Sequence, residues 1–133
     1  MLYKAPLTED YDPICRDLIS RYKDGAVVLL DGVLGSGKTA FVKRFALCFG
    51  AGEAASPTFG IMHEYAPGFR HFDLYRVGGR GFFEHGLHEF LGGGWAFIEW
   101  ADASLVRFLR EEEIEFLQIA FRLEGNCRAL IYE

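Results

Sequence analysis

The chain has 133 residues, half of them hydrophobic, which excludes extensive disorder and predicts a single domain over residues 1–133 with one hydrophobic core. Its formal net charge of -5 disfavours autonomous nucleic-acid binding, because a phosphate backbone needs a basic footprint. The three cysteines are scattered, and no apolar run reaches signal-peptide or membrane length, so we expect a cytoplasmic protein that does not enter a membrane.

Hydrophobic periodicity and glycine punctuation predict alternating helices and strands. In chain order these are an edge strand at 2–5, a helix at 8–22, a buried strand at 26–30, a helix at 38–49, a strand pair at 61–66 and 69–75, a helix at 82–91, a buried strand at 95–98, a helix at 102–110, and a hairpin at 114–123 and 127–132. Thr8 or Asp10 is expected to cap the first helix. Gly78, Gly79 and Gly81 are interpreted as a flexible break.

Residues 32–39 fit the pattern G-x-x-x-x-G-K-[ST] in full. The pattern lies between a predicted buried strand and a predicted helix, which disfavours an ordinary glycine-rich turn. Glycines let backbone N–H groups approach phosphate oxygens, Lys38 supplies a charge for the phosphates, and the Thr39 hydroxyl can ligate Mg²⁺. The expected nucleotide-binding residues are Gly32, Val33, Leu34, Gly35, Ser36, Gly37, Lys38, Thr39 and Ala40.

This phosphate-binding loop (P-loop), together with the order of the elements, predicts an α/β fold. We expect a three-layer sandwich like that of P-loop NTPases, with a mixed, mostly parallel central sheet and a C-terminal β-hairpin.

Two acids lie at or near the ends of predicted strands and are candidates for the chemistry that accompanies a P-loop. In open α/β sheets, ligands gather at the carboxyl ends of strands, where Asp73 and Glu99 are expected. Asp73 could hold Mg²⁺ through water, and Glu99 could orient or deprotonate an attacking water. The metal ligands would then be Thr39, Asp73 and Glu99, although the division of roles between the two acids stays open, and both could be solvated strand-end acids.

Several segments together resemble the TsaE (YjeE) family, the ATPase component of bacterial tRNA threonylcarbamoyladenosine modification. The matching segments are 29–39, Ser56-Pro57-Thr58-Phe59, Glu64-Tyr65, His71-Phe72-Asp73-Leu74-Tyr75-Arg76, 86–90 and Ile98-Glu99-Trp100-Ala101. The P-loop is common to many proteins, whereas the combination of the other motifs, which covers nearly the whole chain, is much more specific.

The resemblance implies an Mg²⁺-dependent ATPase that cycles between ATP and ADP and turns over slowly without partners. It would act with the TsaB and TsaD proteins, which transfer threonylcarbamoyl to adenosine 37 of tRNAs, and would meet tRNA only indirectly. Thr58 would sense the γ-phosphate, Asp73 would anchor Mg²⁺, Glu99 would serve catalysis together with Lys38, and Trp100 would lie beside the nucleotide. Tyr11 is a candidate for stacking on adenine, with a surface aromatic as the alternative.

Two departures from the family pattern concern the loop itself. Val33 stands where an acidic residue is usual, and Ala40 where a second hydroxyl residue is usual. The details of metal coordination and the turnover rate therefore do not follow from the resemblance, but neither departure removes a group that the phosphate cradle requires. ATP is favoured over GTP because the only asparagine, Asn126, is followed by Cys127 rather than by the Lys of an Asn-Lys-x-Asp motif. The alternatives to a tRNA-modification ATPase are a small-molecule kinase and a nucleotide-gated binding module whose hydrolysis is incidental.

Overall fold

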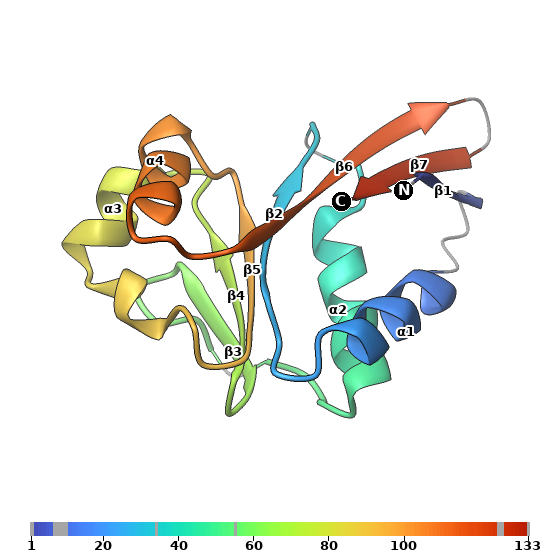
Figure 1. The fold of residues 1–133 in the computed structure, drawn as a ribbon, viewed down its shortest axis with the longest axis horizontal. Helices are drawn as coiled ribbons and strands as arrows, with labels where there is room; N and C mark the ends of the chain where they lie inside the picture. Colours follow the sequence, from blue (N-terminus) through green and yellow to red (C-terminus); the bar gives the residue numbers. More distant parts are fainter. Residues whose placement is uncertain (1, 7–10, 34, 55, 125–126, 133) are drawn as a thin grey trace.

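A computed structural model describes residues 2–6, 11–33, 35–54, 56–124 and 127–132 (Figure 1). Its elements in chain order are β1 (Leu2–Pro6), α1 (Asp12–Arg21), β2 (Val27–Asp31), α2 (Lys38–Phe49), β3 (Met62–Ala66), β4 (Phe69–Asp73), α3 (Gly78–Glu84), a 3₁₀ turn η1 (Leu87–Phe90), β5 (Trp95–Glu99), α4 (Ala103–Glu111), β6 (Phe116–Glu124) and β7 (Cys127–Tyr132). Within the described part of the chain, no helix is both long and apolar enough to cross a bilayer.

The strands form one sheet in the order β1-β7-β6-β2-β5-β4-β3. Strand β2 pairs in parallel with both β6 and β5, and β5 pairs in parallel with β4, so the four central strands are parallel. The outer pairs β1–β7, β6–β7 and β3–β4 are antiparallel. The predicted mixed, mostly parallel central sheet with a C-terminal hairpin is therefore confirmed.

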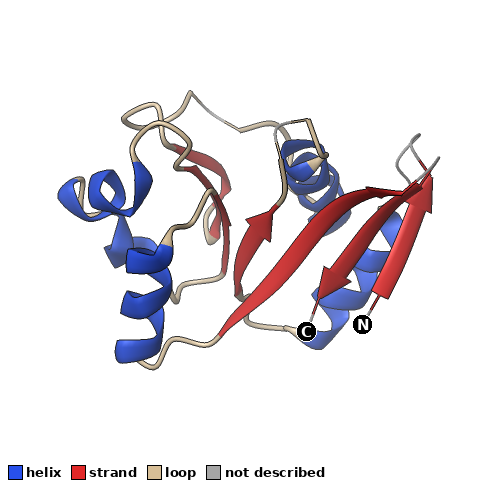
Figure 2. Cartoon of the chain, turned by 90° about the horizontal axis from the view of Figure 1, so that it is seen from above, coloured by secondary structure: helices blue, strands red, loops and turns tan. Residues whose placement is uncertain are grey.

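Helices cover both faces of this sheet, which gives the predicted three-layer sandwich. Helices α1 and α2 pack on one face, and α3 and α4 pack on the other (Figures 1 and 2). Strand β2 lies between the two layers: Val28 and Leu30 join the core beneath α1 and α2, whereas Val27 and Leu29 join the core beneath α3 and α4. The continuous apolar run at this strand is explained by its burial on both faces.

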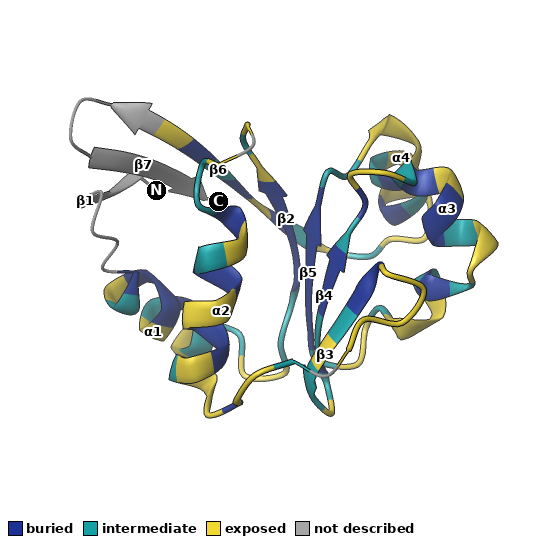
Figure 3. Ribbon diagram, turned by 180° about the vertical axis from the view of Figure 1, so that it is seen from behind, coloured by how far each residue is buried: buried dark blue, intermediate teal, exposed yellow. Residues whose placement is uncertain are grey.

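The core beneath α2 consists largely of aromatic rings. The Phe45 ring lies 4.7 Å from that of Trp95, 4.8 Å from that of Phe97 and 5.9 Å from that of Phe69, measured between centroids. These rings are tilted or edge-on, as the quadrupoles of aromatic pairs favour, and all four side chains are buried. Figure 3 shows that strand β5 is buried along its length. The high aromatic content of the sequence is thus used in large part to hold α2, and the loop that precedes it, on the sheet.

The first helix is shorter than its sequence pattern predicts. It begins at Asp12 rather than at residue 8, with Pro13 in its first turn, where a missing N–H costs nothing. The predicted caps Thr8 and Asp10 lie outside the described residues. Tyr11 occupies the N-cap position without a side-chain capping bond.

The glycine-rich stretch at 78–81 is a helix, and its interpretation as a flexible break is wrong. Helix α3 starts at Gly78, and the Gly79 N–H donates to Asp102 Oδ2 at 2.8 Å. A methyl group at Gly79 would lie 2.5 Å from Ser104 Oγ, so glycine allows α3 to approach the start of α4 closely. The helix predicted at 82–91 is also interrupted, because Gly86 adopts a left-handed conformation between α3 and η1.

Candidate functional site

The P-loop joins the end of β2 to the start of α2, as the sequence predicts. Its last glycine, Gly37, is the N-cap of α2 at φ 108°, a conformation that side chains disfavour. A methyl group at Gly32 would lie 2.7 Å from Ser36 Oγ and 3.0 Å from the Phe121 carbonyl oxygen. The loop therefore folds tightly and leaves no room for a side chain at Gly32; Leu34 lies outside the described residues.

Lys38 is held inside the loop by two contacts. Its side chain is only 4% exposed, and its ammonium donates to the Gly32 carbonyl oxygen at 2.5 Å. The same ammonium lies 3.5 Å from the centroid of the Trp100 ring, in a cation–π contact. Burial lowers the pKa of Lys38 below its usual value, although the charges of Glu99, Asp31 and Asp73 oppose this shift. The Lys38 ammonium is therefore buried within the site by its contacts with Gly32 and Trp100.

The strand register brings the two predicted acids to the same edge of the sheet. Glu99 ends β5 and pairs with Leu30 of β2, while Asp73 ends β4 and pairs with Glu99. The Thr39 hydroxyl, in the first turn of α2, donates to Glu99 Oε2 at 2.9 Å. Because the carboxyl ends of parallel strands meet where α2 begins, residues far apart in sequence lie together at this edge.

These groups line one pocket of about 380 Å³. Its lining residues are Gly35, Ser36, Gly37, Lys38, Thr39, Ala40, Asp73, Tyr75, Glu99 and Trp100. The hydroxyls of Ser36 and Thr39, one ammonium and two carboxylates therefore line the same space beside a helix N-terminus. Such a set suits a phosphate group with a bound magnesium ion. The phosphate needs a cationic group and a helix N-terminus, and the ion needs oxygen ligands.

Glu99 is buried, with 3% of its surface exposed. Burial by itself raises the pKa of a carboxyl group, but the hydrogen bonds from His71 and Thr39 and the charge of Lys38 outweigh it. The pKa of Glu99 therefore lies below its usual value, and the side chain is a carboxylate at neutral pH. In that form it is an acceptor and a base.

His71 is the site residue that sequence reasoning missed. It belongs to the quoted motif at 71–76, but no role was derived for it. Its Nε2 donates to Glu99 Oε2 at 2.5 Å, and it is 3% exposed. The available signal was its position two residues before Asp73, which places both side chains on the same face of a strand.

Two predicted site residues do not reach this pocket. Tyr11 is 1% exposed and packs edge-on against Phe41 at 5.4 Å and Phe121 at 6.5 Å between centroids. It is therefore a core residue rather than a surface aromatic, and its buried ring offers no face to an adenine.

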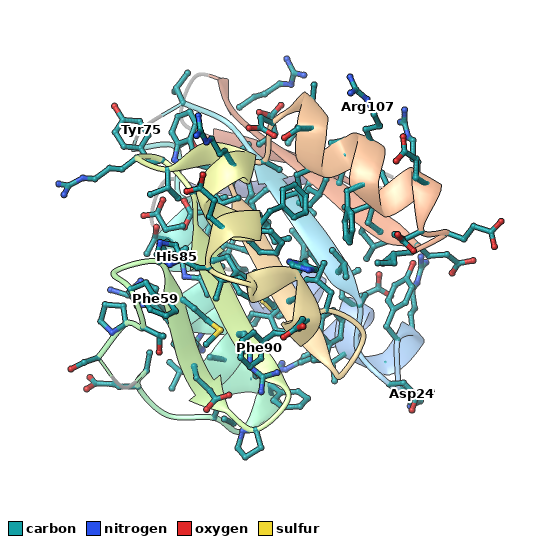
Figure 4. The ribbon with its side chains drawn as sticks, turned by 90° about the vertical axis from the view of Figure 1, so that its left-hand side faces the viewer. Asp24, Phe59, Tyr75, His85, Phe90 and Arg107 are labelled. Atoms are coloured by element: carbon teal, nitrogen blue, oxygen red, sulfur yellow. The ribbon has the colours of Figure 1, made fainter. Side chains whose placement is uncertain are left out.

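Thr58 is exposed and forms a β-bridge with Met62, and it is not among the residues that line the P-loop pocket. Its neighbour Phe59 stacks on His85 with centroids 4.4 Å apart (Figure 4). Val33 in the P-loop points outward and is 75% exposed.

A second pocket of about 680 Å³ adjoins the first and shares Thr39 and Asp73 with it. Its other lining residues are Lys43, Leu47, Gly52, Glu53, Ala54, His63, Tyr65 and His71. Among the residues that the structure describes, no group of three or more His, Cys, Asp or Glu side chains is arranged to hold a metal ion. A metal at this edge would therefore need ligands from a bound molecule or water in addition to the protein oxygens.

The comparisons with known proteins agree on one family. The family model described as "Threonylcarbamoyl adenosine biosynthesis protein TsaE" matches residues 6–128. The tRNA threonylcarbamoyladenosine biosynthesis protein TsaE of Bacillus subtilis is 39% identical over 111 residues, which is 78% of this chain and 66% of that protein. The protein of the same name from Aquifex aeolicus is 34% identical over 100 residues, 71% of each chain.

The fold comparison gives the same result. The crystal structure of YdiB from Bacillus subtilis superposes with a TM-score of 0.67 at 30% sequence identity, covering 99% of this chain and 83% of that chain. The P-loop pocket, the matched motifs and the sheet topology therefore have one explanation: the chain belongs to the TsaE family.

Proposed function

We propose that the chain binds and hydrolyses Mg²⁺-ATP at the P-loop pocket and does so for tRNA threonylcarbamoyladenosine biosynthesis, acting with the TsaB and TsaD proteins. The observation that carries this proposal is the convergence of Lys38, Thr39, Asp73 and Glu99 on one pocket at the N-terminus of α2. Membership of the TsaE family supports the pathway, because the relatives carry threonylcarbamoyladenosine biosynthesis in their names.

The loop fits a phosphate group. Ser36 Oγ is buried and makes no hydrogen bond with any described residue. Buried hydroxyls normally have a partner, so a bound phosphate oxygen would supply the one that Ser36 lacks. Gly32, Gly35 and Gly37 all have positive φ in the loop that leads into the N-terminus of α2, and anions bind at helix N-termini. Lys38 adds a full charge, and its present contacts with Gly32 and Trp100 would be exchanged for contacts with phosphate oxygens.

The pocket also fits Mg²⁺, which prefers oxygen ligands. The Thr39 hydroxyl and the Asp73 carboxylate would hold the ion together with phosphate oxygens and water, with the Glu99 carboxylate beside them. The ion supplies neutralisation of charge on the phosphates. Within this arrangement Asp73 would anchor the ion through water, and Glu99 would orient the attacking water and accept its proton. Trp100 would lie beside the nucleotide, and Thr58 would respond to the γ-phosphate after its loop moves toward the pocket.

The decisive experiment mixes the purified chain with TsaB, TsaD and substrate tRNA and measures ATP hydrolysis and tRNA modification with and without the chain. We expect both activities to depend on the chain and to be lost with Lys38→Ala, because no other described ammonium lines the P-loop pocket. Lys23→Ala, at an exposed lysine beyond the end of α1, is the matched control and should behave as wild type. Full tRNA modification with Lys38→Ala would contradict the proposal.

A small-molecule kinase is the second candidate function, and the adjoining pocket of about 680 Å³ is the observation that favours it. An acceptor bound there would lie next to Thr39 and Asp73, beside the place expected for the γ-phosphate. A kinase would consume ATP when a small acceptor is added and would not need TsaB or TsaD. The nucleotide-gated binding module is distinguished by a different result: Asp73→Ala or Glu99→Ala would still bind ATP and still support tRNA modification.

A further inference from the structure

His71 is a buried polar residue to which the proposed function assigns no role. It lies on β4 and is 3% exposed, in a sheet whose other buried positions are mostly apolar. Burial of an imidazole costs free energy unless its nitrogens find hydrogen-bond partners. Its partner is Glu99, and both side chains of this pair are 4% exposed. The hydrogen bond between His71 and Glu99 is therefore shielded from water, and the packing around it limits the movement of both side chains.

The sheet register explains how the two side chains meet. His71 and Asp73 lie on the face of β4 toward α2, as does Phe69 in the core of that layer. On β5, Phe97 pairs with His71, and Glu99 pairs with Asp73. His71 is thus the diagonal neighbour of Glu99, at a separation that long side chains can bridge.

Both hydrogen bonds to Glu99 reach the same oxygen. His71 Nε2 donates to Oε2 at 2.5 Å, and the Thr39 hydroxyl donates to Oε2 at 2.9 Å. Oε1 accepts no hydrogen bond from any described residue. Two donors on one oxygen restrict the rotation of the carboxylate, and its second oxygen is available to a ligand of the pocket.

The imidazole of His71 also contacts a ring on the neighbouring strand. The ring of His63, on the neighbouring strand β3, stacks on it with centroids 5.5 Å apart and planes inclined by 28°. Rotation of the His71 ring would break this stack as well as the bond to Glu99. A chain of contacts therefore links His63 on β3 to His71 on β4, and His71 to the Glu99 carboxylate on β5.

We propose that His71 is a positioning residue for ATP hydrolysis, which holds the Glu99 carboxylate through Nε2–H···Oε2 so that Oε1 faces the reacting water. This inference rests on the proposed function, in which Glu99 acts on that water. Thr39 would exchange Glu99 for Mg²⁺ when the nucleotide binds, and His71 would then be the remaining described donor that fixes the carboxylate.

The kinetic test compares His71→Leu, His71→Gln and wild type in the presence of TsaB and TsaD. We expect His71→Leu to lower kcat by about 10- to 100-fold, the usual effect of losing a residue that orients a catalytic group. The Kd for ATP, measured by calorimetry, should stay within about threefold of wild type, because the hydrogen bond described for the His71 side chain goes to Glu99 and not to the P-loop. His71→Gln should recover most of kcat, since its amide can donate to the same oxygen. His63→Leu, which removes only the stacking ring, is the matched control and should have a smaller effect.

A second readout does not depend on turnover. Long-range ¹H–¹⁵N spectra of the imidazoles in the nucleotide-free chain should show His71 protonated at Nε2, with signals that shift in Glu99→Ala while those of the exposed His85 do not. Unchanged His71 signals in Glu99→Ala would overturn the inference, and so would wild-type kcat or an equal loss of kcat and ATP affinity in His71→Leu. If His71→Leu does not fold, the imidazole spectra of Glu99→Ala and the kcat of His71→Gln decide whether the inference holds. A wild-type chain with no partner-dependent turnover would instead overturn the proposed function, and the inference with it.

Discussion

Replacement of Trp100 tests whether the contact between the Lys38 ammonium and the Trp100 ring competes with phosphate binding. The ammonium of Lys38 lies 3.5 Å from the Trp100 ring centroid and is 4% exposed, so the indole occupies one side from which a phosphate oxygen would approach. A desolvated cation–π contact contributes about 1–2 kcal/mol. If binding breaks this contact, Trp100→Leu should strengthen the affinity for a phosphate chain by about 5- to 30-fold.

Magnesium tripolyphosphate is the suitable ligand, because it occupies the phosphate subsite without an adenine that Trp100 could contact. Calorimetry on wild type and Trp100→Leu gives the two Kd values directly. Tyr75→Leu is the matched control: Tyr75 lines the same pocket and touches Trp100 with ring centroids 5.0 Å apart, but it makes no described contact with Lys38. Equal or weaker tripolyphosphate binding by Trp100→Leu would refute the reasoning, provided that its urea unfolding shows a folded protein.

Three further predictions concern stability and are measured by urea unfolding. Gly79→Ala places a methyl group 2.5 Å from Ser104 Oγ and should cost about 1–3 kcal/mol, whereas Gly52→Ala meets nothing within 4 Å and should be neutral or stabilise by about 0.4–1 kcal/mol. Phe45→Ala removes the central ring beneath α2 and should cost about 3–5 kcal/mol. Hydrogen bonds from Ser104, Gly79 and Leu105 hold the pKa of Asp102 below its usual value despite partial desolvation, so the ionised carboxylate stabilises the fold above the unfolded-state pKa of about 3.9. The stability advantage of wild type over Asp102→Asn should therefore be present at neutral pH and disappear as the pH falls below about 4; an advantage that persists in acid would contradict this assignment.

The part of the fold that sequence predicts well is the part that local patterns determine. The apolar run at β2, the glycines of the P-loop and the helix at 38–49 follow one another without interruption, and each constrains the next. Helix α2 accordingly has the predicted bounds, and it ends at the predicted Gly50. The acids Asp73 and Glu99 were found because each stands at the end of a strand, and parallel strands end at one edge.

The contacts that sequence does not predict depend on approach between distant segments. Gly79 was interpreted as a breaker because glycine has no helical preference, but its role is set by Asp102 and Ser104, which lie in another element. Tyr11 was expected either to stack on adenine or to be a surface aromatic, whereas Phe41 and Phe121 bury it. The bond between His71 and Glu99 requires the pairing of β4 with β5, and no local pattern gives that register.

Several polar groups of the P-loop pocket contact one another before any ligand binds. Lys38 is paired with the Gly32 carbonyl and the Trp100 ring, and Thr39 is paired with Glu99. The affinity for a nucleotide is therefore the difference between the contacts that it makes and the internal contacts that it replaces. The two substitutions should have opposite effects on phosphate affinity. Trp100→Leu removes the contact that competes for the Lys38 ammonium and should tighten phosphate binding. Lys38→Ala removes the charge that the phosphates need and should weaken it. If both substitutions weakened tripolyphosphate binding, the internal contacts would be part of the bound state rather than its competitors.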